Sequence, residues 1–447
     1  MKKHPILTGT LILSAAGFLS RLIGFLYRIY LSRTFGAQAV GVLQMTAPVT
    51  AMVMAVSCSG IQTALSKRIA ELDDSQQRLK KSYLLASLFI SVSISTILAL
   101  FIRHYSSALA NGYLQEAQTE ALLNILAISF PLSAVHSCFA GYWLGQQKAK
   151  MPAFCQLFEQ LVRVTTVIFL CEFSKAGGSA VSLRFAVIGS AAGEFVAVCA
   201  CLFCAIFGGS NSLQISKREY LQPEHSHTPI VSHMEHLQPF RFCMRNLFSM
   251  AAPLSLNRLS LNFLQSVEAV RIPLSLRLYG CTDAEALTIY GILTGIALPV
   301  LFFPGAFIGP FSQMLLPTVS QAHSRKEYGR IRTIMINTSF ILVFLGVFCS
   351  LALFLFADFL GNVIFQEPLA AGYIRSLCLL CPLLYLNQVL SGILQGLGDA
   401  FGVFFINTFS VFLRLCFVFF SIPQIGIRGY FYGLLFAQLS AAVFFCV

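Results

Sequence analysis

The sequence predicts an all-α polytopic membrane protein with about twelve transmembrane helices in two six-helix lobes. Three observations predict this class: the composition, the spacing of the apolar runs and an internal repeat. Of the 447 residues, 57% are hydrophobic and only 11% are charged, whereas soluble domains carry about 25% charged residues. Together with a mean hydropathy of +0.76, this composition excludes a soluble enzyme, a disordered scaffold and a secreted disulfide-bonded protein.

Each predicted helix is a run of roughly 20 mostly apolar residues, the length that crosses the hydrocarbon core of a bilayer. The first run carries two arginines and lacks a small-residue cleavage site, so we expect a retained helix rather than a signal peptide. The eighth run contains four prolines, which predict a kinked or partly unwound segment. The twelve runs cover residues 8–31, 40–66, 82–102, 119–143, 152–173, 184–207, 246–272, 286–317, 333–357, 372–397, 401–421 and 428–447.

The longest polar stretch separates the first six spans from the last six. It predicts an N-terminal six-helix lobe over residues 1–207, a cytoplasmic inter-lobe connector over 208–245 and a C-terminal six-helix lobe over 246–447. Four histidines fall in the connector, at a spacing that a metal ion could use. We interpret this segment as a solvated connector and predict no metal. The four histidines are His225, His227, His233 and His236.

The two halves of the chain are related by a repeat with an offset of 251 residues. Pro131 and Pro382 stand at this offset, and a series in the same order follows. Because each half has an even number of spans, both halves begin on the same side of the membrane. The repeat is therefore parallel, as in two-lobed transporters that bind substrate between the lobes. The further matches are Gly141 with Gly392, Gly145 with Gly396 and Arg163 with Arg414.

Most of the net charge of +12 is explained by membrane topology. Of the 30 basic residues, 17 fall in loops on one side, 6 on the other and 7 within the spans. Basic residues collect in cytoplasmic loops. We therefore expect a multi-pass protein of the plasma membrane with both termini in the cytoplasm, and no nucleic-acid partner.

Ionisable residues inside the spans are the main functional signal, because a charge at bilayer depth must face protein, water or a counter-ion. Glu159 and Arg163 are four residues apart on one helix face and predict an ion pair. Arg414 repeats Arg163 without an equivalent acid, and Glu268 lies three residues before Arg271 as a candidate partner. The residues within the spans are Arg21, Arg28, Arg163, Arg258, Arg271, Arg375, Arg414, Glu159, Glu194 and Glu268.

Arg21, Arg28 and Arg258 have no acid within one helical turn. We predict that they line a cavity for an anionic ligand, since a guanidinium group binds phosphate through two parallel hydrogen bonds. Arg271, which could instead reach the interface from its span end, completes the predicted substrate-binding set. Glu159, Arg163, Glu194, Glu268 and Arg414 are assigned to ion sites or structural pairs.

Other chemistry is not indicated. The chain has no G-x-x-x-x-G-K-[ST] motif for ATP and no catalytic constellation, so we predict no enzyme activity and no cofactor. Most of the 14 cysteines sit inside apolar runs, where cysteine behaves as a small hydrophobic residue. His136, in the fourth span, is interpreted as packed in the core.

Two motifs carry a resemblance to a known family. The first helix reads Arg21-x-x-Gly24-Phe25-x-x-Arg28, and the tenth span reads Ser391-Gly392-Ile393-Leu394-Gln395-Gly396-Leu397-Gly398. With these motifs the whole chain resembles the stage V sporulation protein B branch of the polysaccharide-exporter and multidrug/oligosaccharidyl-lipid flippase superfamily. It is more distantly similar to bacterial lipid II flippases. The resemblance implies a MATE-like fold.

The resemblance also implies a function. We expect a flippase that moves a lipid-linked oligosaccharide, of the undecaprenyl pyrophosphate-sugar kind, from the inner to the outer leaflet. The implied substrate is a peptidoglycan precursor of the lipid II type, with a role in spore cortex synthesis. Arg21 and Arg28 match the cavity arginines of the family, and Arg258 matches a further one. Relatives often have fourteen spans, so this chain is either a twelve-span member or truncated.

Two alternatives remain at this point. A multidrug cation antiporter of the same superfamily would need carboxylates inside the membrane, where arginines predominate here. A non-transporting membrane scaffold would recruit cell-wall synthesis proteins through its cytoplasmic loops and would not need the arginines within the spans. Membrane lipids are partners in each case.

Overall fold

The computed structural model describes residues 5–73, 76–207, 238–306 and 308–446. Every regular element in these ranges is a helix, and the chain has the all-α fold class that its composition predicts. Ten segments of the described residues are long and apolar enough to cross a membrane. One of them, Ala15–Ala70, covers the first predicted span from residue 15 onward and all of the second. Helix α10 (Gln238–Tyr279) occupies the place of the seventh.

The first part of the chain forms helices interrupted by short irregular turns. Inside α1 (Pro5–Met45) the backbone breaks at Gly36, where a φ of 77° lies in a region that glycine adopts without steric cost. This break falls in the loop expected between the first two spans. The helices that follow are α2 (Ala47–Met54), η1 (Ala55–Ser59), α3 (Gly60–Ala70), α4 (Gln77–His104), α5 (Ser106–Ala108), η2 (Leu109–Leu114), α6 (Thr119–Gly145), α7 (Lys150–Ala176) and α8 (Arg184–Phe207).

The second part begins with α10 and confirms the prediction of a broken eighth span. The helix passes through a π-helical segment, η3, and then a short 3-10 turn, η4, which begins at Pro304. The helices of this part are α11 (Asp283–Gly291), η3 (Ile292–Ala297), α12 (Leu298–Phe302), η4 (Pro304–Ala306), α13 (Ile308–Ser324), α14 (Tyr328–Asp358), η5 (Phe359–Phe365), α15 (Pro368–Leu377), η6 (Cys378–Leu380), α16 (Cys381–Gly396), α17 (Ala400–Phe420), α18 (Ile422–Ile425) and α19 (Ile427–Cys446).

The chain divides into two compact units. The first unit contains residues 1–20, 50–106 and 121–259, and the second contains 21–49, 107–120 and 260–447. Both α1 and α10 therefore contribute to both units. The division into lobes at 1–207 and 246–447 stays a prediction. Of the predicted connector, residues 208–237 with their four histidines lie outside the described residues.

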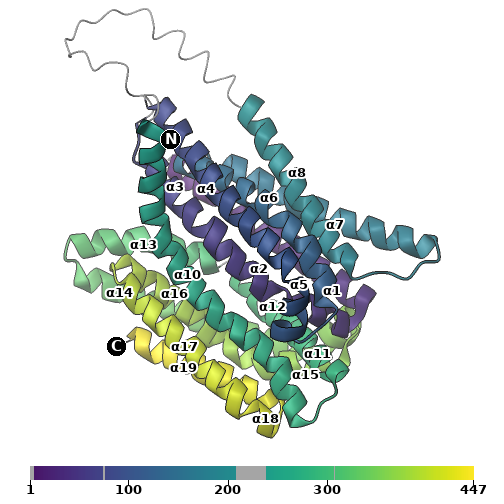
Figure 1. Ribbon diagram of the computed structural model, residues 1–447. Coiled ribbons are helices and arrows are strands. Elements are labelled where there is room, and N and C mark those ends of the chain that lie inside the picture. Colours follow the sequence, from purple (N-terminus) through teal and green to yellow (C-terminus); the bar gives the residue numbers. More distant parts are fainter. Residues whose placement is uncertain (1–4, 74–75, 208–237, 307, 447) are drawn as a thin grey trace, which may run out of the picture. The chain divides into compact units, whose positions relative to one another are not determined.

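In the first unit, glycine allows two helices to approach closely. A side chain at Gly189 would meet Val167, and one at Gly193 would meet the backbone oxygen of Glu159. The backbones of α7 and α8 can therefore lie against each other, as small residues allow in membranes. Figure 1 shows these two helices crossing in one part of the molecule.

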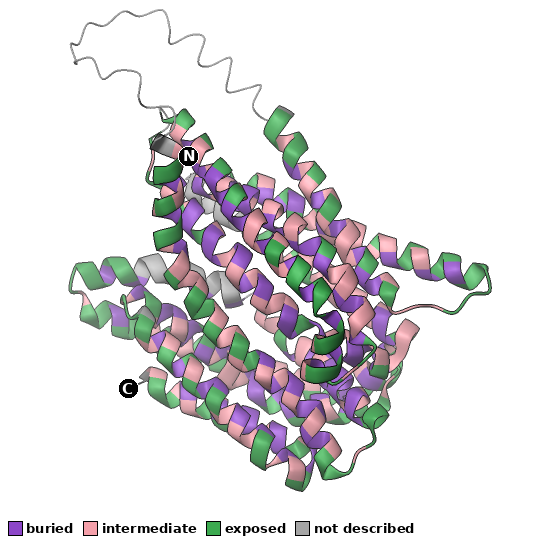
Figure 2. Ribbon diagram, in the orientation of Figure 1, coloured by how far each residue is buried: buried purple, intermediate pink, exposed green. Residues whose placement is uncertain are grey.

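In the second unit, α17 and α19 lie side by side (Figure 1). Gly433 on α19 packs against the ring of Phe417 on α17. Along both helices, buried positions alternate with exposed ones at helical spacing (Figure 2). Elsewhere in this unit, Gly41 of α1 and Gly291 of α11 each lie against the backbone of the other helix. This contact holds the second half of α1 in the unit.

The backbone confirms the internal repeat. Gln115 ends η2 and Gln366 ends η5, and both adopt the left-handed conformation, with φ of 54° and 58°. Gln147 after α6 and Gly398 after α16 also have positive φ, of 59° and 94°. Each pair is separated by the offset of 251 residues that the sequence predicts. Each half therefore repeats not only residues but also the unusual turns that end its helices.

Candidate functional site

The second unit contains a cavity of about 960 Å³, formed by α1 together with helices of the C-terminal half. This volume is at the upper end of the range of roughly 300–1,000 Å³ for ligand sites in proteins. All the described residues that line the cavity belong to the second unit. The cavity can therefore be treated as a feature of the second unit alone.

One wall of the cavity is a single face of α1. Arg21, Gly24, Phe25 and Arg28 all line it, at the i, i+3, i+4 and i+7 spacing that places residues on one side of a helix. Phe25 is held by the ring of Phe303, with the ring centroids 4.9 Å apart. Arg21 and Arg28 are seven positions apart in the sequence, which places their Cα atoms about 10 Å apart along the helix axis.

The charge of the cavity is positive. Among the described residues that line it, Arg21 and Arg28 are the charged ones. Arg28 is half-buried, and no carboxylate in the described part of the chain lies within ion-pair distance of it. An anionic ligand would therefore gain attraction that is only weakly screened, because screening falls as a site becomes buried.

The cavity is also lined by side-chain amides from α16, α17 and α19. Asn387 donates hydrogen bonds from Nδ2 to the backbone oxygen of Gln438, at 2.9 Å, and to its Oε1, at 2.8 Å. Its Oδ1 atom is buried with no hydrogen-bond partner in the described residues. Buried polar atoms usually have partners, so this oxygen is available to a ligand donor. The other lining amides are Gln388, Gln395 and Asn407.

Two of the four predicted substrate-binding arginines are not among the described residues that line this cavity. Arg258 belongs to the first unit, is exposed, and donates a 3.4 Å hydrogen bond to Oγ1 of Thr63. Arg271 places its guanidinium 4.7 Å from the ring centroid of Phe419, a cation–π contact. Their role in substrate binding stays a prediction.

The buried acid of α10 pairs with an arginine other than the expected candidate. Glu268 Oε2 accepts a 2.9 Å hydrogen bond from Arg414, and Tyr430 donates to Glu268 Oε1 at 2.9 Å. The expected neighbour, Arg271, lies against an aromatic ring instead. Glu268 therefore joins α10 to α17 and α19, a link between distant segments that spacing along one helix cannot reveal.

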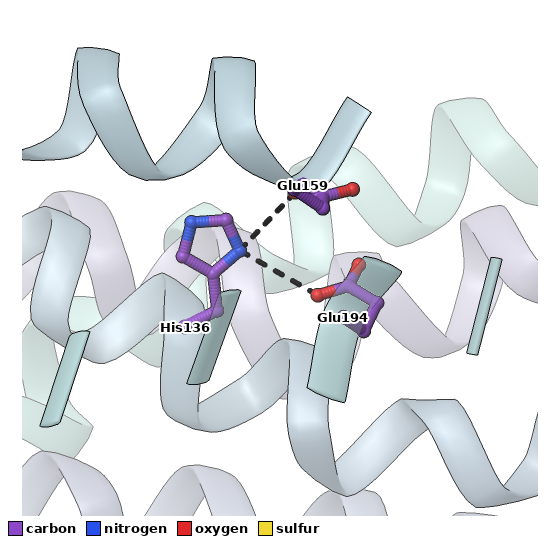
Figure 3. Close-up of side chains that lie close together, drawn as sticks. All are labelled: His136, Glu159 and Glu194. Carbon is purple, nitrogen blue, oxygen red and sulfur yellow. Dashed lines mark ion pairs between the residues drawn. The ribbon is translucent and has the colours of Figure 1, made fainter. Parts of the chain in front are cut away.

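A second polar cluster lies in the first unit. His136 on α6 points its Nδ1 atom between two carboxylates, 3.4 Å from Glu159 Oε2 on α7 and 3.5 Å from Glu194 Oε2 on α8. Figure 3 shows the imidazole between the two acids. Arg163 pairs with the other oxygen of Glu159. The three residues have the donor set and proximity of a metal or proton site.

Sequence reasoning missed the amides of the cavity and the partners of His136. The amides did leave a signal, because Gln388, Ser391 and Gln395 recur at helical spacing inside an apolar span. His136, interpreted as a core residue, is half-buried and lies beside two acids on other helices. Nothing in the local sequence around His136 indicates those acids, since they lie 23 and 58 residues away.

Comparisons with curated proteins identify similar sporulation proteins. The chain is 28% identical to stage V sporulation protein B of Bacillus subtilis (strain 168) over 442 residues, covering 96% of this chain and 80% of that protein. It is 21% identical to sporulation protein YkvU of the same organism, covering 95% of this chain and 91% of that protein. Both similarities extend over nearly the whole chain.

Solved structures show the same fold. An inward-facing multidrug resistance MATE family transporter of the MOP superfamily matches with a TM-score of 0.72 at 14% identity, over 98% of this chain and 96% of that one. A MOP superfamily transporter from Pyrococcus furiosus matches with a TM-score of 0.66 at 14% identity, over 99% of this chain and 94% of that one. The description of that structure reports a reverse polarity of its binding pocket. The chain thus has the MATE fold.

Two protein families match the chain directly. The MatE family matches residues 262–420, within the C-terminal half. The family described as polysaccharide biosynthesis protein matches residues 6–323, which is more than half of the chain. The chain therefore belongs to the polysaccharide biosynthesis protein family, within the multidrug/oligosaccharidyl-lipid/polysaccharide flippase superfamily.

Proposed function

We propose that this protein is a flippase that carries a lipid-linked oligosaccharide from the inner to the outer leaflet of the plasma membrane by alternating access, with both termini in the cytoplasm. The substrate we propose is a peptidoglycan precursor of the lipid II type, used in spore cortex synthesis. One observation carries the proposal: the described residues that line the large cavity in the second unit include two arginines and no acid.

The proposed substrate matches the two kinds of side chain in the cavity. Arg21 and Arg28 would bind the pyrophosphate, since guanidinium groups bind phosphate oxygens with charge-assisted hydrogen bonds. The amides of Asn387, Gln388 and Asn407 would bind sugar hydroxyls, which both donate and accept hydrogen bonds. The isoprenoid tail would remain in the lipid.

The membrane potential would contribute to transport in this direction. The cytoplasm is negative, and the pyrophosphate carries about two negative charges. Moving them outward is favoured by roughly 4–5 kcal/mol per 100 mV if no compensating ion moves. A cationic drug would be opposed by the same cavity, because both lining charges repel it. We therefore favour lipid-linked sugar over a multidrug cation as the cargo.

The experiment that tests this function compares ligands on one protein. The full chain in nanodiscs is titrated with lipid II, undecaprenyl phosphate and a cationic dye, and flipping of lipid II is measured in proteoliposomes. Arg28→Ala should weaken lipid II binding roughly tenfold or more, because a hydrogen bond to a charged group is worth about 1.5–3 kcal/mol. Arg28→Lys, which keeps the charge but loses the planar fork, should be intermediate.

A matched control is available in the same unit. Arg330→Ala removes an exposed arginine that is paired with Glu327 and lies outside the cavity, so binding should be unchanged. Unaltered flipping in a folded Arg28→Ala variant would contradict the proposal. Binding of the dye in place of lipid II would favour the cation antiporter, and dispensable arginines with an essential cytoplasmic connector would favour the scaffold.

A further inference from the structure

We propose that His136, Glu159 and Glu194 form a binding site for one exchangeable proton, carried on the imidazole of His136. The site lies in the first unit, on three different helices. It is separate in the chain from the arginine-lined cavity of the second unit. Only the transport part of its test rests on the proposed function.

The geometry places a single nitrogen between two acceptors. His136 Nδ1 is 3.4 Å from one oxygen of Glu159 and 3.5 Å from one oxygen of Glu194 (Figure 3). A neutral imidazole with its proton on the other nitrogen would place a lone pair against two negative oxygens. A proton on Nδ1 turns the same contacts into hydrogen bonds from an imidazolium. The arrangement therefore favours the protonated ring.

The unsatisfied atoms of the cluster support this reading. Glu194 Oε2 is buried with no hydrogen-bond partner in the described part of the chain. An orphaned carboxylate oxygen is costly to bury, because it has lost its water without replacement. A protonated His136 Nδ1, 3.5 Å from this oxygen, is a donor that could satisfy it. Glu159 is already bonded to Arg163 through its other oxygen.

The charges of the cluster distinguish a proton from a divalent ion. Two carboxylates and the Arg163 guanidinium leave one net negative charge when His136 is neutral. One proton brings the cluster to neutrality, whereas a divalent cation would leave one net positive charge. Because uncompensated charge is expensive at bilayer depth, the cluster matches one monovalent charge. A ring nitrogen as the central ligand suits a proton better than a hard alkali ion.

Thiols also lie near His136 and its two acids. Cys155 faces it from α7, and Cys58 of η1 faces Glu194. Cys201 on α8 lies 3.7 Å from Cys155, measured between the two sulfur atoms. Neutral thiols add no charge to the count, but they could titrate in an experiment and must be tested separately.

The cluster is shielded but still accessible. The side chains of His136 and Glu194 are 16% exposed and that of Glu159 is 12% exposed. A proton can therefore enter and leave, while most of the solvent that would screen the two acids is excluded. Gly193 makes this arrangement possible, because a side chain there would meet the Glu159 backbone and hold α8 away from α7.

The protein contains its own reporter for this site. Trp143 is the only tryptophan. It lies two turns after His136 on α6, packed with Phe139, Cys155 and Cys201. Two turns of helix place it on the same face as His136, about 10 Å along the axis. A change of charge at His136 should therefore alter the emission of Trp143.

The test follows Trp143 fluorescence of the full chain in nanodiscs from about pH 5 to about pH 9, the range in which histidine titrates. The wild type should show one reversible step, which should disappear in His136→Gln. Cys155→Ser should keep the step. Glu194→Gln should keep it too but move its midpoint to lower pH, because the imidazolium then faces one carboxylate instead of two.

Each other outcome overturns the proposal. A wild type without a step, or a step that persists in folded His136→Gln, would show that His136 does not exchange a proton. If His136→Gln does not fold, the midpoint in Glu194→Gln decides, and an unshifted midpoint rejects the site. If ZnCl₂ or NaCl at fixed pH changes the emission of the wild type but not of Glu194→Gln, the occupant is a metal ion.

A second measurement separates this site from the proposed function. The rate of lipid II flipping should vary with pH in the wild type and become independent of pH in His136→Gln. Arg28→Ala should lose lipid II binding and still show the Trp143 step. A missing step with normal lipid II binding would reject only the proton site. A normal step without lipid II binding in the wild type would reject only the flippase proposal.

Discussion

The repeat places one arginine in each unit, and the two arginines have different partners. Arg163 pairs with Glu159 one turn away on its own helix, beside His136 and Glu194. Arg414 pairs with Glu268 on α10, which also accepts a hydrogen bond from Tyr430. In the first unit the repeated charge belongs to a cluster with one acid in excess. In the second it is neutralised by one acid, and the contacts join three helices.

This difference shows that residues at equivalent positions of the repeat can have different partners and surroundings. Arg414 joins helices in the second unit, whereas Arg163 belongs to the cluster that we propose as a proton site. The charges that line the cavity of the second unit come instead from α1, through Arg21 and Arg28. Three predictions test how firmly this comparison holds.

The largest expected effect is on the buried pair of the second unit. Glu268→Gln leaves the Arg414 guanidinium without its acid, where the two side chains are 6% and 17% exposed. Removing one partner of a buried pair costs about 3–5 kcal/mol. Thermal unfolding of the purified variant should show this loss, and Glu268→Leu with Arg414→Leu should recover much of it.

The matched variant in the first unit is Glu194→Gln, which removes an acid that has no arginine partner in the described residues. We expect it to change the free energy of unfolding by less than about 1 kcal/mol, the usual range for a substitution that leaves no buried charge unpaired. Equal losses in both variants would remove the distinction between the two units.

An intermediate effect is expected where helices approach through glycine. Gly291→Ala places a methyl group against the backbone of Ala37 and Gly41, which cannot rotate away. Overpacking of this kind costs about 1–3 kcal/mol. Gly193→Ala should cost less, because its methyl group would lie 2.9 Å from the nearest backbone oxygen, that of Glu159, whereas the methyl group at position 291 would lie much closer to the backbone oxygen of Ala37. Unfolding of both variants measures the difference.

The control for this comparison is Gly372→Ala on α15, where a methyl group would meet nothing within 4 Å. Alanine stabilises a helix interior by about 0.5–1 kcal/mol relative to glycine, so this variant should be neutral or more stable. A loss as large as that of Gly291→Ala would show that the packing argument is wrong.

The smallest effect is expected at the repeated turns. Gly398 and Gln147 occupy equivalent positions with positive φ, but only glycine adopts this conformation without steric cost. Gly398→Gln should therefore destabilise the second unit by about 1–2 kcal/mol. Gln147→Gly should gain less than that, because glycine also loses more conformational entropy on folding. Denaturant unfolding of both variants tests the equivalence of the two turns.

Much of the fold could be predicted from the sequence, because apolar runs long enough to cross a bilayer can be recognised from consecutive residues alone. Each predicted span is mainly helical where it is described, with a turn at Thr46 and a bend at Phe303. The 251-residue offset reappears in the turns at Gln115 and Gln366. The break in the eighth span was also predictable, since proline removes a backbone donor and clashes with the preceding turn.

The candidate sites were predictable only in part. Arg21 and Arg28 could be singled out because charge inside an apolar run is costly, and their spacing places them on one helix face. The partner of Glu268 could not be predicted. Arg414 lies 146 residues away, and Arg271, only three residues from Glu268, offered a local alternative. Pairing across helices depends on how the helices pack.

By itself the sequence determined the membrane class, the helices, the repeat and the positive residues that must be accommodated within the spans, since each follows from local hydropathy or spacing. Only the tertiary structure decided that Arg21 and Arg28 share a cavity with amides of α16, α17 and α19. It alone placed His136 between two acids. The physical reason is that the cost of a charge inside a span can be recognised from the sequence, because it depends on the apolar residues around it. The group that compensates the charge is set by which helix packs beside it.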